Sequence, residues 1–317
     1  MAHPAAEAWK RLDRTAHGPV RVEVLKERPR ASAYRLVGAG PRNGTIIAKH
    51  CRGEIAALER RLYDDLLPRL GSGAPRCFGQ VEASAGSSWL FVEDAGTEEE
   101  TGLREEHARL LAEWLASFHI AAAGSRLQGS LPGRDTRYYR SRLESTQESI
   151  RRSWSSPALQ SDDRGILRDI LVCCERLACR WDRVERACAP WPETLVHGDL
   201  VGKNLRVRAG RNGPALLAFD WEEAGWGVPL IDLVEFKLGR ARAGLGAYGF
   251  EVQRAWPRIR EEDCRSMAEW GALLWILTVL CGESRGLADG GTARAMRKFP
   301  VYRTWFADAL RELGMET

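Results

Sequence analysis

The sequence predicts an α+β protein built from a sheet-forming first part and a helical second part. Segments that alternate apolar and polar residues, as half-buried strands do, are concentrated before residue 94. After that point, apolar residues recur at spacings of three and four, as on the buried face of a helix. At 317 residues the chain is longer than most single domains. We therefore expect two domains, residues 1–94 and residues 95–317.

The first part carries the pattern of five strands and one helix. We expect strands at residues 20–26, 33–37, 45–49, 77–82 and 88–93. A helix follows Lys49 directly and places Ile55, Leu58, Leu62 and Leu66 on one buried face. The last strand ends at Glu93-Asp94-Ala95-Gly96, and we expect the crossover between the two parts there.

The second part is predicted to be mainly helical, with one hairpin. Helical periods run from Leu110 to Phe118, from Ile166 to Trp181 and from Met267 to Leu277. Two short apolar runs, 205–208 and 215–219, are separated by a segment containing Asn212-Gly213, a dipeptide that favours tight turns between antiparallel strands. We therefore expect a β-hairpin there.

The hairpin would bring together side chains suited to phosphate chemistry. It sets Asn204 roughly opposite Asp220, and cross-strand neighbours lie about 5 Å apart. Amide and carboxylate oxygens are the hard ligands that Mg²⁺ prefers. Asp199 precedes Asn204 by one loop turn, a position that suits a carboxylate accepting a proton from a hydroxyl nucleophile. This pattern points to phosphoryl transfer.

The stretch from His197 to Asn204, followed by Asp220-Trp221-Glu222, resembles the catalytic loop and metal-binding motif of kinases. Gly198 stands where protein kinases usually carry arginine, and Trp221-Glu222 replaces Phe-Gly. The variant HGDLxxxN followed by a DWE or DFE segment looks like the aminoglycoside phosphotransferase and choline kinase family, whose members phosphorylate small molecules. The segment Gly225 to Asp232 also fits that family.

The resemblance implies a protein-kinase-like fold with a smaller N-terminal nucleotide-binding lobe and a larger, mainly helical C-terminal lobe. It makes Asp199 the catalytic base, and Asn204 and Asp220 the ligands of Mg²⁺. His197 and Asp232 become structural supports of the catalytic loop. The implied reaction is transfer of phosphate from ATP, or from GTP, to a hydroxyl of a small molecule such as an aminoglycoside or another antibiotic.

A kinase of this type also needs a lysine on a strand for the phosphates and a glutamate on the next helix to hold it. Lys49 ends the strand 45–49, like the lysine of the family's phosphate-binding strand. Glu59 lies in a segment that resembles the family's ExxxY helix. Glu54, one turn earlier, competes for the same role, and the sequence does not decide between the two.

The remaining nucleotide contacts follow from the same resemblance. The loop 27–32 contains no glycine, unlike a GxGxxG phosphate loop, and Ser32 offers its hydroxyl and amide to the nucleotide instead. Adenine is expected at the crossover, hydrogen-bonded to the backbone of Glu93, Asp94 and Ala95. Backbone contacts in the same segment would distinguish ATP from GTP. The sequence alone does not show which of the two nucleotides is preferred.

The sequence leaves the acceptor open. Aminoglycosides are polycations that need an acidic pocket, for which Glu222 and Glu223 are the candidates; Glu98 to Glu100 form a second acidic run that we expect to be solvated. Choline, sugar and amino-alcohol kinases are the alternative, and a quaternary ammonium would call for an aromatic box, which twelve tryptophans could supply. The arginines between Arg134 and Arg152 favour a solvated helical face over an anion site.

The alternative to an enzyme is a pseudokinase, which would bind the nucleotide without turnover. Lys49, Asp199, Asn204 and Asp220 are all present, whereas a catalytically dead relative would commonly have lost one of them. A protein kinase is disfavoured because Gly225 to Pro229 arrives too soon after Asp220 for an activation loop, and no APE-like segment follows.

Composition excludes several other classes of protein. The net charge of +4 results from 47 basic and 43 acidic residues spread along the chain, without a recognisable nucleic-acid module, so we expect no nucleic-acid partner. We recognise no apolar run of about 20 residues and no secretory leader, and expect a cytoplasmic enzyme without a membrane partner. The eight cysteines lack CxxC spacing, which favours reduced thiols over a metal site. The oligomeric state is not readable from the sequence.

Overall fold

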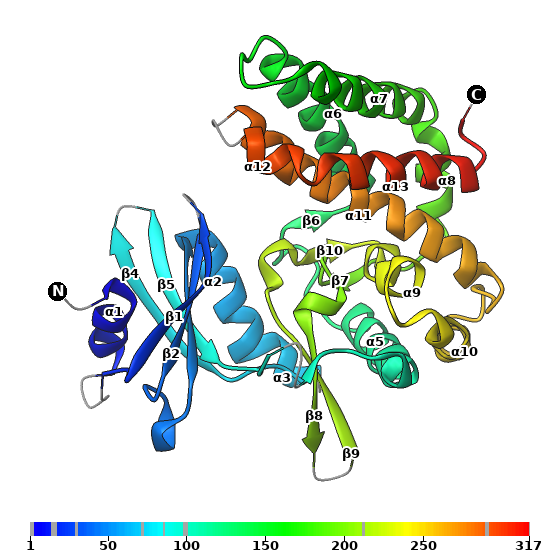
Figure 1. The fold of residues 1–317 in the computed structure, drawn as a ribbon. Coiled ribbons are helices and arrows are strands. Elements are labelled where there is room, and N and C mark those ends of the chain that lie inside the picture. Colours follow the sequence, from blue (N-terminus) through cyan, green and yellow to red (C-terminus); the bar gives the residue numbers. More distant parts are fainter. Residues whose placement is uncertain are drawn as a thin grey trace. The chain divides into compact units, whose positions relative to one another are not determined.

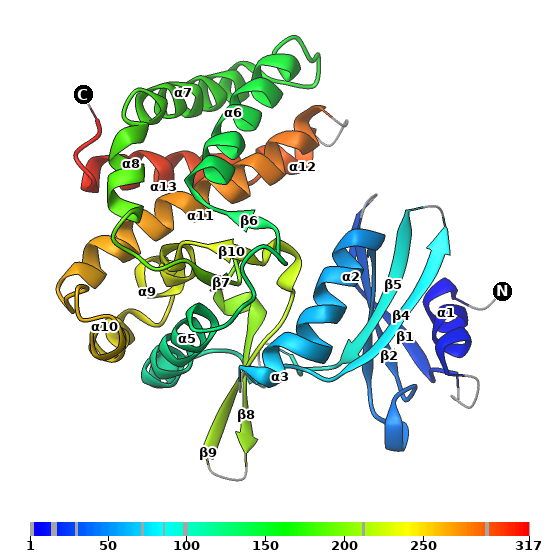
Figure 2. The same cartoon turned by 180° about the vertical axis from the view of Figure 1, so that it is seen from behind.

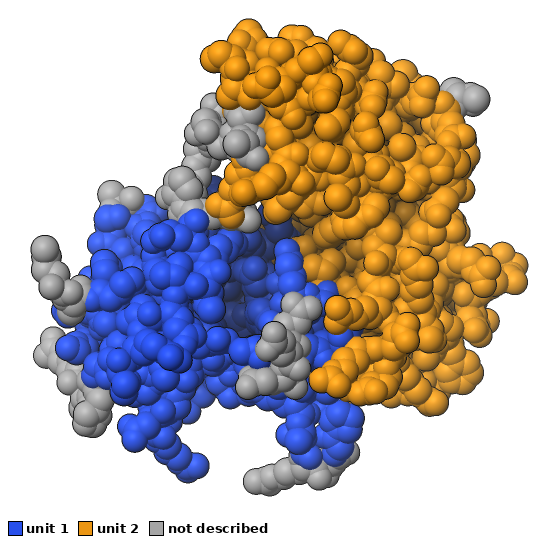
Figure 3. Space-filling view, in the orientation of Figure 1, with its two compact units in different colours: residues 1–103, 202–223 blue, residues 104–201, 224–317 orange. Residues whose placement is uncertain are grey.

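The computed structural model describes residues 3–13, 18–28, 31–70, 73–84, 86–97, 101–210, 213–288 and 292–316. The chain forms two compact units (Figure 3): unit 1 contains residues 1–103 and 202–223, and unit 2 contains residues 104–201 and 224–317. The predicted α+β class is confirmed. The expected functional division into residues 1–94 and 95–317 stays a prediction; the compact units differ from it because the hairpin after residue 202 packs within unit 1.

Unit 1 is built around a five-stranded antiparallel sheet (Figure 1). Its strands are β1 (Arg21–Arg28), β2 (Ala31–Val37), β3 (Ile46–Arg52), β4 (Cys77–Ser84) and β5 (Ser87–Glu93), in the order β1-β2-β3-β5-β4. All five expected strands are therefore present. The register pairs Ala48 of β3 with Tyr34 of β2 and Phe91 of β5, so that these neighbouring side chains point to one face of the sheet.

Helix α1 (Pro4–Leu12) covers that face, and α2 (Gly53–Arg61) lies on the other (Figures 1 and 2). Trp9 of α1 packs with Phe91 at a ring-centroid distance of 5.2 Å, and its indole N–H donates to the carbonyl of Ala39 at 3.0 Å. Burying a large apolar side chain contributes roughly 1.5–3 kcal/mol. The sequence analysis did not predict α1, although it closes the core of unit 1.

The helix after β3 is longer than expected, and a different face of it is buried. It continues from α2 through η2 (Leu62–Leu66), a wider π-helical turn, into α3 (Leu67–Arg69). The deeply buried face carries Ala56, Glu59 and Leu62, whereas Ile55 and Leu58, expected at its centre, are half-buried. Glu59 is consequently only 1% exposed. Such wider turns recur next to functional sites.

The predicted hairpin is formed by β8 (Leu205–Gly210) and β9 (Gly213–Ala218), with the short 3₁₀ turns η4 (Gly202–Asn204) before it and η5 (Trp221–Glu223) after it. Leu205 pairs with Ala218, and the N–H of Phe219 donates to the carbonyl of Asn204 at 3.1 Å. Asn204 therefore faces Phe219, one residue before the expected partner Asp220. The turn residue Asn212 lies outside the described residues.

Unit 2 is mainly helical, as expected, with a small sheet beside the catalytic loop. Its longer helices are α5 (Ala108–Ala123), α6 (Thr136–Ser153), α7 (Ser161–Ala178), α8 (Trp181–Cys188), α10 (Leu245–Ala255), α11 (Asp263–Ala288) and α13 (Phe299–Glu312). The shorter ones are η3 (Glu105–His107), α9 (Val234–Leu238), η7 (Arg242–Gly244) and α12 (Thr292–Met296). The sheet has the order β6-β10-β7, from β6 (Gly133–Arg134), β10 (Gly225–Gly227) and β7 (Thr194–Val196).

Helix α11 is the longest helix among the described residues of unit 2, and much of it is apolar. Among the described residues, it is the one helix that is long and apolar enough to cross a membrane, by length and composition alone. The sequence analysis recognised no such stretch. In the fold, 72% of its apolar window is buried, as in the core helix of a folded domain. All eight cysteines are described and are free thiols, and six of them are buried.

Candidate active site

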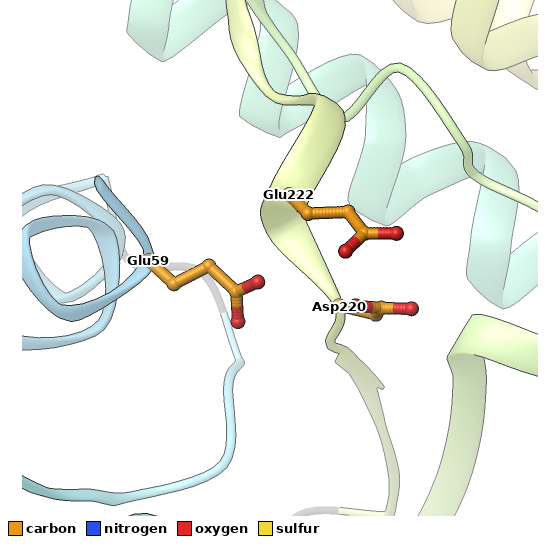
Figure 4. Close-up of side chains that lie close together, drawn as sticks. All are labelled: Glu59, Asp220 and Glu222. Carbon is orange, nitrogen blue, oxygen red and sulfur yellow. The ribbon is translucent and has the colours of Figure 1, made fainter. Parts of the chain in front are cut away.

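Lys49 lies at the centre of a cluster of carboxylates in unit 1. Its side chain extends from β3 and forms ion pairs with Glu59 of α2 and with Asp220, which follows β9. A third carboxylate, that of Glu222 in η5, lies 3.5 Å from the ammonium nitrogen. Figure 4 shows these carboxylates coming from two different segments into one space, and single oxygens of the three lie within 4.8 Å of one another.

The structure shows that Glu59, and not Glu54, pairs with Lys49. Glu59 points inward to Lys49, whereas Glu54 is exposed and pairs with Arg52 at 2.7 Å. Five helical residues correspond to about 500°, so the two glutamates point in directions about 140° apart. Only one of them can therefore face the sheet.

The cluster has unusual electrostatics because more negative charges than positive ones share a buried space. Burial raises the pKa of Glu59 to about 7, since Lys49, which opposes this shift, is also shared with Asp220. Burial alone would lower the pKa of Lys49, but the surrounding carboxylates outweigh it and raise that pKa well above its usual range. Burial would also raise the pKa of Asp220, yet Lys49 and Lys26 hold it well below its usual range. Lys49 and Asp220 are therefore the firmly charged pair.

Asp220 is held in a conformation that residues other than glycine rarely adopt. Its φ is +66°, in the left-handed region, which costs an ordinary residue on the order of 1 kcal/mol or more. Its backbone N–H donates to the hydroxyl of Tyr63 at 3.3 Å. Tyr63 comes from the π-helical turn after α2, so the same helix holds Lys49 through Glu59 and Asp220 through Tyr63. The strain has a structural use, because it turns the carboxylate toward Lys49.

A cavity of about 450 Å³ adjoins this cluster, entirely within unit 1. Its volume is in the range of small-molecule sites. The predicted nucleotide and metal residues that line it are Ser32, Lys49, Glu59, Glu93, Asp94, Ala95 and Asp220. Apolar side chains such as Leu25, Ile47 and Leu90 supply the walls between them. Of the loop expected to replace a glycine-rich phosphate loop, Pro29 and Arg30 lie outside the described residues.

The crossover segment includes backbone donors for which the described residues provide no partner. The carboxylates of Glu93 and Asp94 are engaged by Arg208 and Arg35, each at 2.7 Å. The carbonyl of Ala95 accepts from the hydroxyl of Thr101 at 3.1 Å. Within the described part of the chain, the N–H of Ala95 makes no hydrogen bond. The side chains of this segment therefore hold the fold together, and its backbone can contact a ligand.

The first part of the predicted catalytic loop, His197 to Val201, lies in unit 2 and is held by Asp232 of η6 (Pro229–Leu233). The buried carboxylate of Asp232 accepts from the backbone N–H of His197 at 2.7 Å and of Gly198 at 2.8 Å. The ring of His197 in turn accepts from the N–H of Asp199 at 3.3 Å. Asp199 itself is half-buried, and its carboxylate accepts a hydrogen bond from the indole N–H of Trp275 at 2.8 Å.

Comparison with known proteins shows the family to which the chain belongs. A sequence model described as "Phosphotransferase enzyme family" matches residues 25–261. The chain belongs to this family. It is a small-molecule phosphotransferase that acts on hydroxyl groups. No curated protein sequence matches the chain.

Solved structures similar to this phosphotransferase share its fold at low sequence identity. The microcompartment-associated aminopropanol kinase has a TM-score of 0.62 at 15% identity, over 98% of this chain and 97% of its own. The GDP and kanamycin complex of APH(2")-IIia has a TM-score of 0.61 at 14% identity, over 94% and 97%. Choline kinase from Cryptosporidium parvum Iowa II has a TM-score of 0.58 at 12% identity, over 93% and 91%. The predicted kinase-like fold is confirmed.

The other residues proposed from the sequence are not all gathered at the cavity of the phosphotransferase. Asn204 is buried in unit 1 and is not among the residues that line the cavity. Glu222 adjoins Lys49, and Glu223 is half-buried at the end of η5. Glu98, Glu99 and Glu100 lie outside the described residues. The roles of these residues, like those of Asp199 and Lys49, stay predictions.

Sequence reasoning missed two residues of the phosphotransferase that touch the catalytic loop or its brace. His119 of α5 is fully buried and lies 3.3 Å from a carboxylate oxygen of Asp232 and 3.0 Å from the hydroxyl of Tyr248. Trp275 was considered only as a possible ring of an aromatic box. A lone histidine on the apolar face of a predicted helix was the available signal for His119; no local pattern marks Trp275.

Proposed function

We propose that the protein transfers the terminal phosphoryl group of ATP to a hydroxyl of a small molecule, with Mg²⁺ as cofactor. The observation that supports this most directly is the Lys49 cluster at one end of a cavity of about 450 Å³. A buried ammonium beside an apolar space suits an anionic phosphate chain attached to a planar base. GTP is the alternative donor.

The residues of unit 1 divide the recognition of the nucleotide among them. Lys49, oriented by Glu59, neutralises phosphate oxygens. The N–H of Ala95 donates to the base, and Ser32 donates to the phosphates from the start of β2. An adenine ring offers an acceptor nitrogen to such a donor, and guanine offers its O6, so this contact suits either nucleotide.

The oxygen donors present fit Mg²⁺. Asp220, with a carboxylate that stays ionised, is the principal ligand that we propose, with Asn204 as the second. When bound with the nucleotide, the metal supplies positive charge to the phosphates. Lys49 must then exchange part of its contact with Asp220 for contact with phosphate.

Asp199 is the proposed catalytic base. It accepts the proton of the acceptor hydroxyl as that oxygen forms a bond to phosphorus and the bond to the leaving diphosphate breaks. The proton passes from the hydroxyl oxygen to the carboxylate, so no external acid or base is required. Asp232 and His197 hold the loop so that the carboxylate keeps its orientation.

For the acceptor we propose an aminoglycoside or another antibiotic, with an amino alcohol as the second candidate. Relatives of similar fold support both, since one is described in complex with kanamycin and others as choline and aminopropanol kinases. One observation favours the amino alcohol: Trp275 beside Asp199 packs against Trp305, and Tyr302 adjoins Trp305, with centroid distances of 5.8 and 5.9 Å. Aromatic rings of this kind attract ammonium groups.

We further propose a cytoplasmic enzyme that uses neither nucleic acid nor a membrane as partner. Eight free thiols are consistent with a reducing compartment, which also supplies ATP and Mg²⁺. A pseudokinase without turnover is the alternative that the following experiment addresses.

The test measures release of nucleoside diphosphate from ATP and from GTP with Mg²⁺, over a panel of aminoglycosides, other antibiotics, amino alcohols, sugars and nucleosides. Asp199→Ala is the blank for each acceptor. We expect one class of acceptor to stimulate release in the wild type and not in the variant. Binding of Mg-ATP without stimulated release by any acceptor would contradict the proposal and favour the pseudokinase.

A further inference from the structure

We infer that Trp275 is a positioning residue for the catalytic carboxylate: α11, a helix remote in sequence from the loop, sets the orientation of Asp199 through the indole N–H. The inference rests on the proposed function, since it assigns Trp275 a role only if Asp199 is the base. It extends that function by making the C-terminal helices part of the catalytic apparatus of unit 2.

The first support is the hydrogen bond itself. The indole nitrogen of Trp275 and Oδ1 of Asp199 are 2.8 Å apart, a normal length for an N–H donor and a carboxylate. Trp275 is only 8% exposed, so water competes little for this donor. A carboxylate turns freely about its terminal bond unless a neighbour holds it. A bond to one oxygen therefore fixes the plane in which the other oxygen lies.

The second support is the way in which α11 is seated on the segment that braces the loop. A Cβ atom at Gly271 would lie 1.8 Å from the carbonyl oxygen of Leu230, so no side chain fits there. Leu230 belongs to η6, the turn that carries Asp232. The helix therefore touches the backbone of the brace, and Trp275, one turn further along the same side, reaches Asp199.

The third support is that the ring of Trp275 is itself held in place. It packs against Trp305 of α13 at a centroid distance of 5.8 Å, and Trp305 packs against Tyr302 at 5.9 Å. Trp275 has few alternative rotamers in these surroundings. The loop is thus held from two directions: Asp232 fixes its backbone, and Trp275 fixes the side chain that does the chemistry.

Loss of the indole N–H should lower kcat, because the carboxylate of Asp199 would no longer be held in one orientation. The KM for ATP should stay the same because unit 1 carries the nucleotide contacts. A residue that only fills space would change stability without this separate effect on kcat.

The decisive variant is Trp275→Phe, which keeps an aromatic ring and removes the donor. Its control is Trp181→Phe, because Trp181 of α8 is also buried and its indole N–H finds no hydrogen-bond partner among the described residues. With the acceptor found in the panel above, we expect kcat of Trp275→Phe to fall between about tenfold and a hundredfold, as is typical when a hydrogen-bonded support of a site residue is removed. Trp181→Phe should keep the kcat of the wild type.

A second pair of variants tests the seating of the helix. Gly271→Ala should lower kcat at unchanged KM for ATP, as Trp275→Phe does. Gly282→Ala on the same helix is its control, because a Cβ there meets no atom within 4 Å. If Gly271→Ala does not fold, Trp275→Phe still decides the matter.

Three results are distinguishable. A Trp275→Phe variant with wild-type kcat would overturn the inference while leaving the proposed function in place. A wild type that transfers phosphate to no acceptor would overturn the proposed function and the inference with it. A fall in kcat at unchanged KM for ATP, absent from Trp181→Phe, would establish Trp275 as a positioning residue.

Discussion

The Lys49 cluster of unit 1 and the catalytic loop of unit 2 hold their polar groups in opposite ways. Around Lys49, carboxylates compete for a single ammonium by charge. In the loop, Asp232 and Trp275 fix their partners by directional hydrogen bonds between 2.7 and 2.8 Å. Charge attraction tolerates an exchange of partners, whereas short directional bonds do not. The function that we propose requires both arrangements: a nucleotide site whose charges can exchange partners, and a base that is held in one orientation.

The largest expected effect follows from removing the base while keeping its hydrogen bond. Asp199→Asn retains an oxygen for the indole of Trp275 but takes up no proton. We expect kcat to fall by about 10³-fold, within the range of general-base contributions, with unchanged affinity for Mg-ATP. Steady-state kinetics and calorimetric titration measure the two quantities. A variant with wild-type turnover would refute the role of Asp199.

Removing the carboxylate of Asp232, which holds the backbone of the loop, should have the largest effect on stability. Asp232→Ala leaves two buried backbone N–H groups without an acceptor, and we expect the free energy of unfolding to fall by about 3 kcal/mol. Urea unfolding measures it. A loss below about 1 kcal/mol would show that water replaces the carboxylate, and that the loop is held less firmly than its bonds indicate.

Removing a charge from the cluster should affect binding. Asp220→Ala takes away the principal proposed metal ligand, and we expect the Kd for Mg-ATP to rise at least about tenfold, equivalent to about 1.4 kcal/mol. The measurement is a titration with ATP at several Mg²⁺ concentrations. Unchanged dependence of affinity on Mg²⁺ would remove Asp220 from the metal site.

Glu59 predicts a dependence of stability on pH. Because its pKa is raised from 4.5 to about 7, the folded state retains a proton that the unfolded state loses in this window. The contribution of Glu59 to stability is therefore greatest at low pH and decreases as pH rises toward 7. Relative to Glu59→Gln, the wild type should lose on the order of 1 kcal/mol between pH 5 and pH 8. Urea unfolding at both values measures the difference, with Glu54→Gln on the exposed side of the same helix as control.

The smallest effect is expected at an exposed pair, which provides the baseline. Arg140 and Glu144 on α6 are one helical turn apart at 3.3 Å, and both are more than half exposed. Glu144→Gln should change the free energy of unfolding by less than about 0.5 kcal/mol. A larger loss would mean that charge pairs at the surface of this protein matter as much as the buried ones.

Local patterns in the sequence identified most of the cavity of unit 1. Alternation located the five strands, and the lysine that ends an apolar strand is the lysine of the cluster. The pairing of Glu59 over Glu54 required the phase of the helix relative to the sheet, which the apolar spacing placed slightly wrong. The one-residue difference at Asn204 has another cause, because the register of a hairpin depends on its turn. The dipeptide Asn212-Gly213 in the sequence predicts a tight turn but does not specify the register.

Contacts between distant segments could not be read from the sequence. Trp275 lies 76 positions from Asp199, and His119 lies 113 positions from Asp232. Neither residue is part of a motif with its partner, so only the packing of the helices reveals the contact. Helix α1 was not predicted for a related reason. Its small residues and single tryptophan form a buried face only when they pack against the sheet.

The lysine at the centre of unit 1 means that this protein carries its own counterion. In the absence of nucleotide, the ammonium of Lys49 already compensates the charge of Asp220, so a bare divalent ion would have to compete with Lys49 for this carboxylate. Under the function that we propose, a ligand that brings negative phosphates together with the metal would draw the ammonium to itself and leave the carboxylate to the metal. We therefore expect Mg²⁺ to bind more tightly together with the nucleotide than alone.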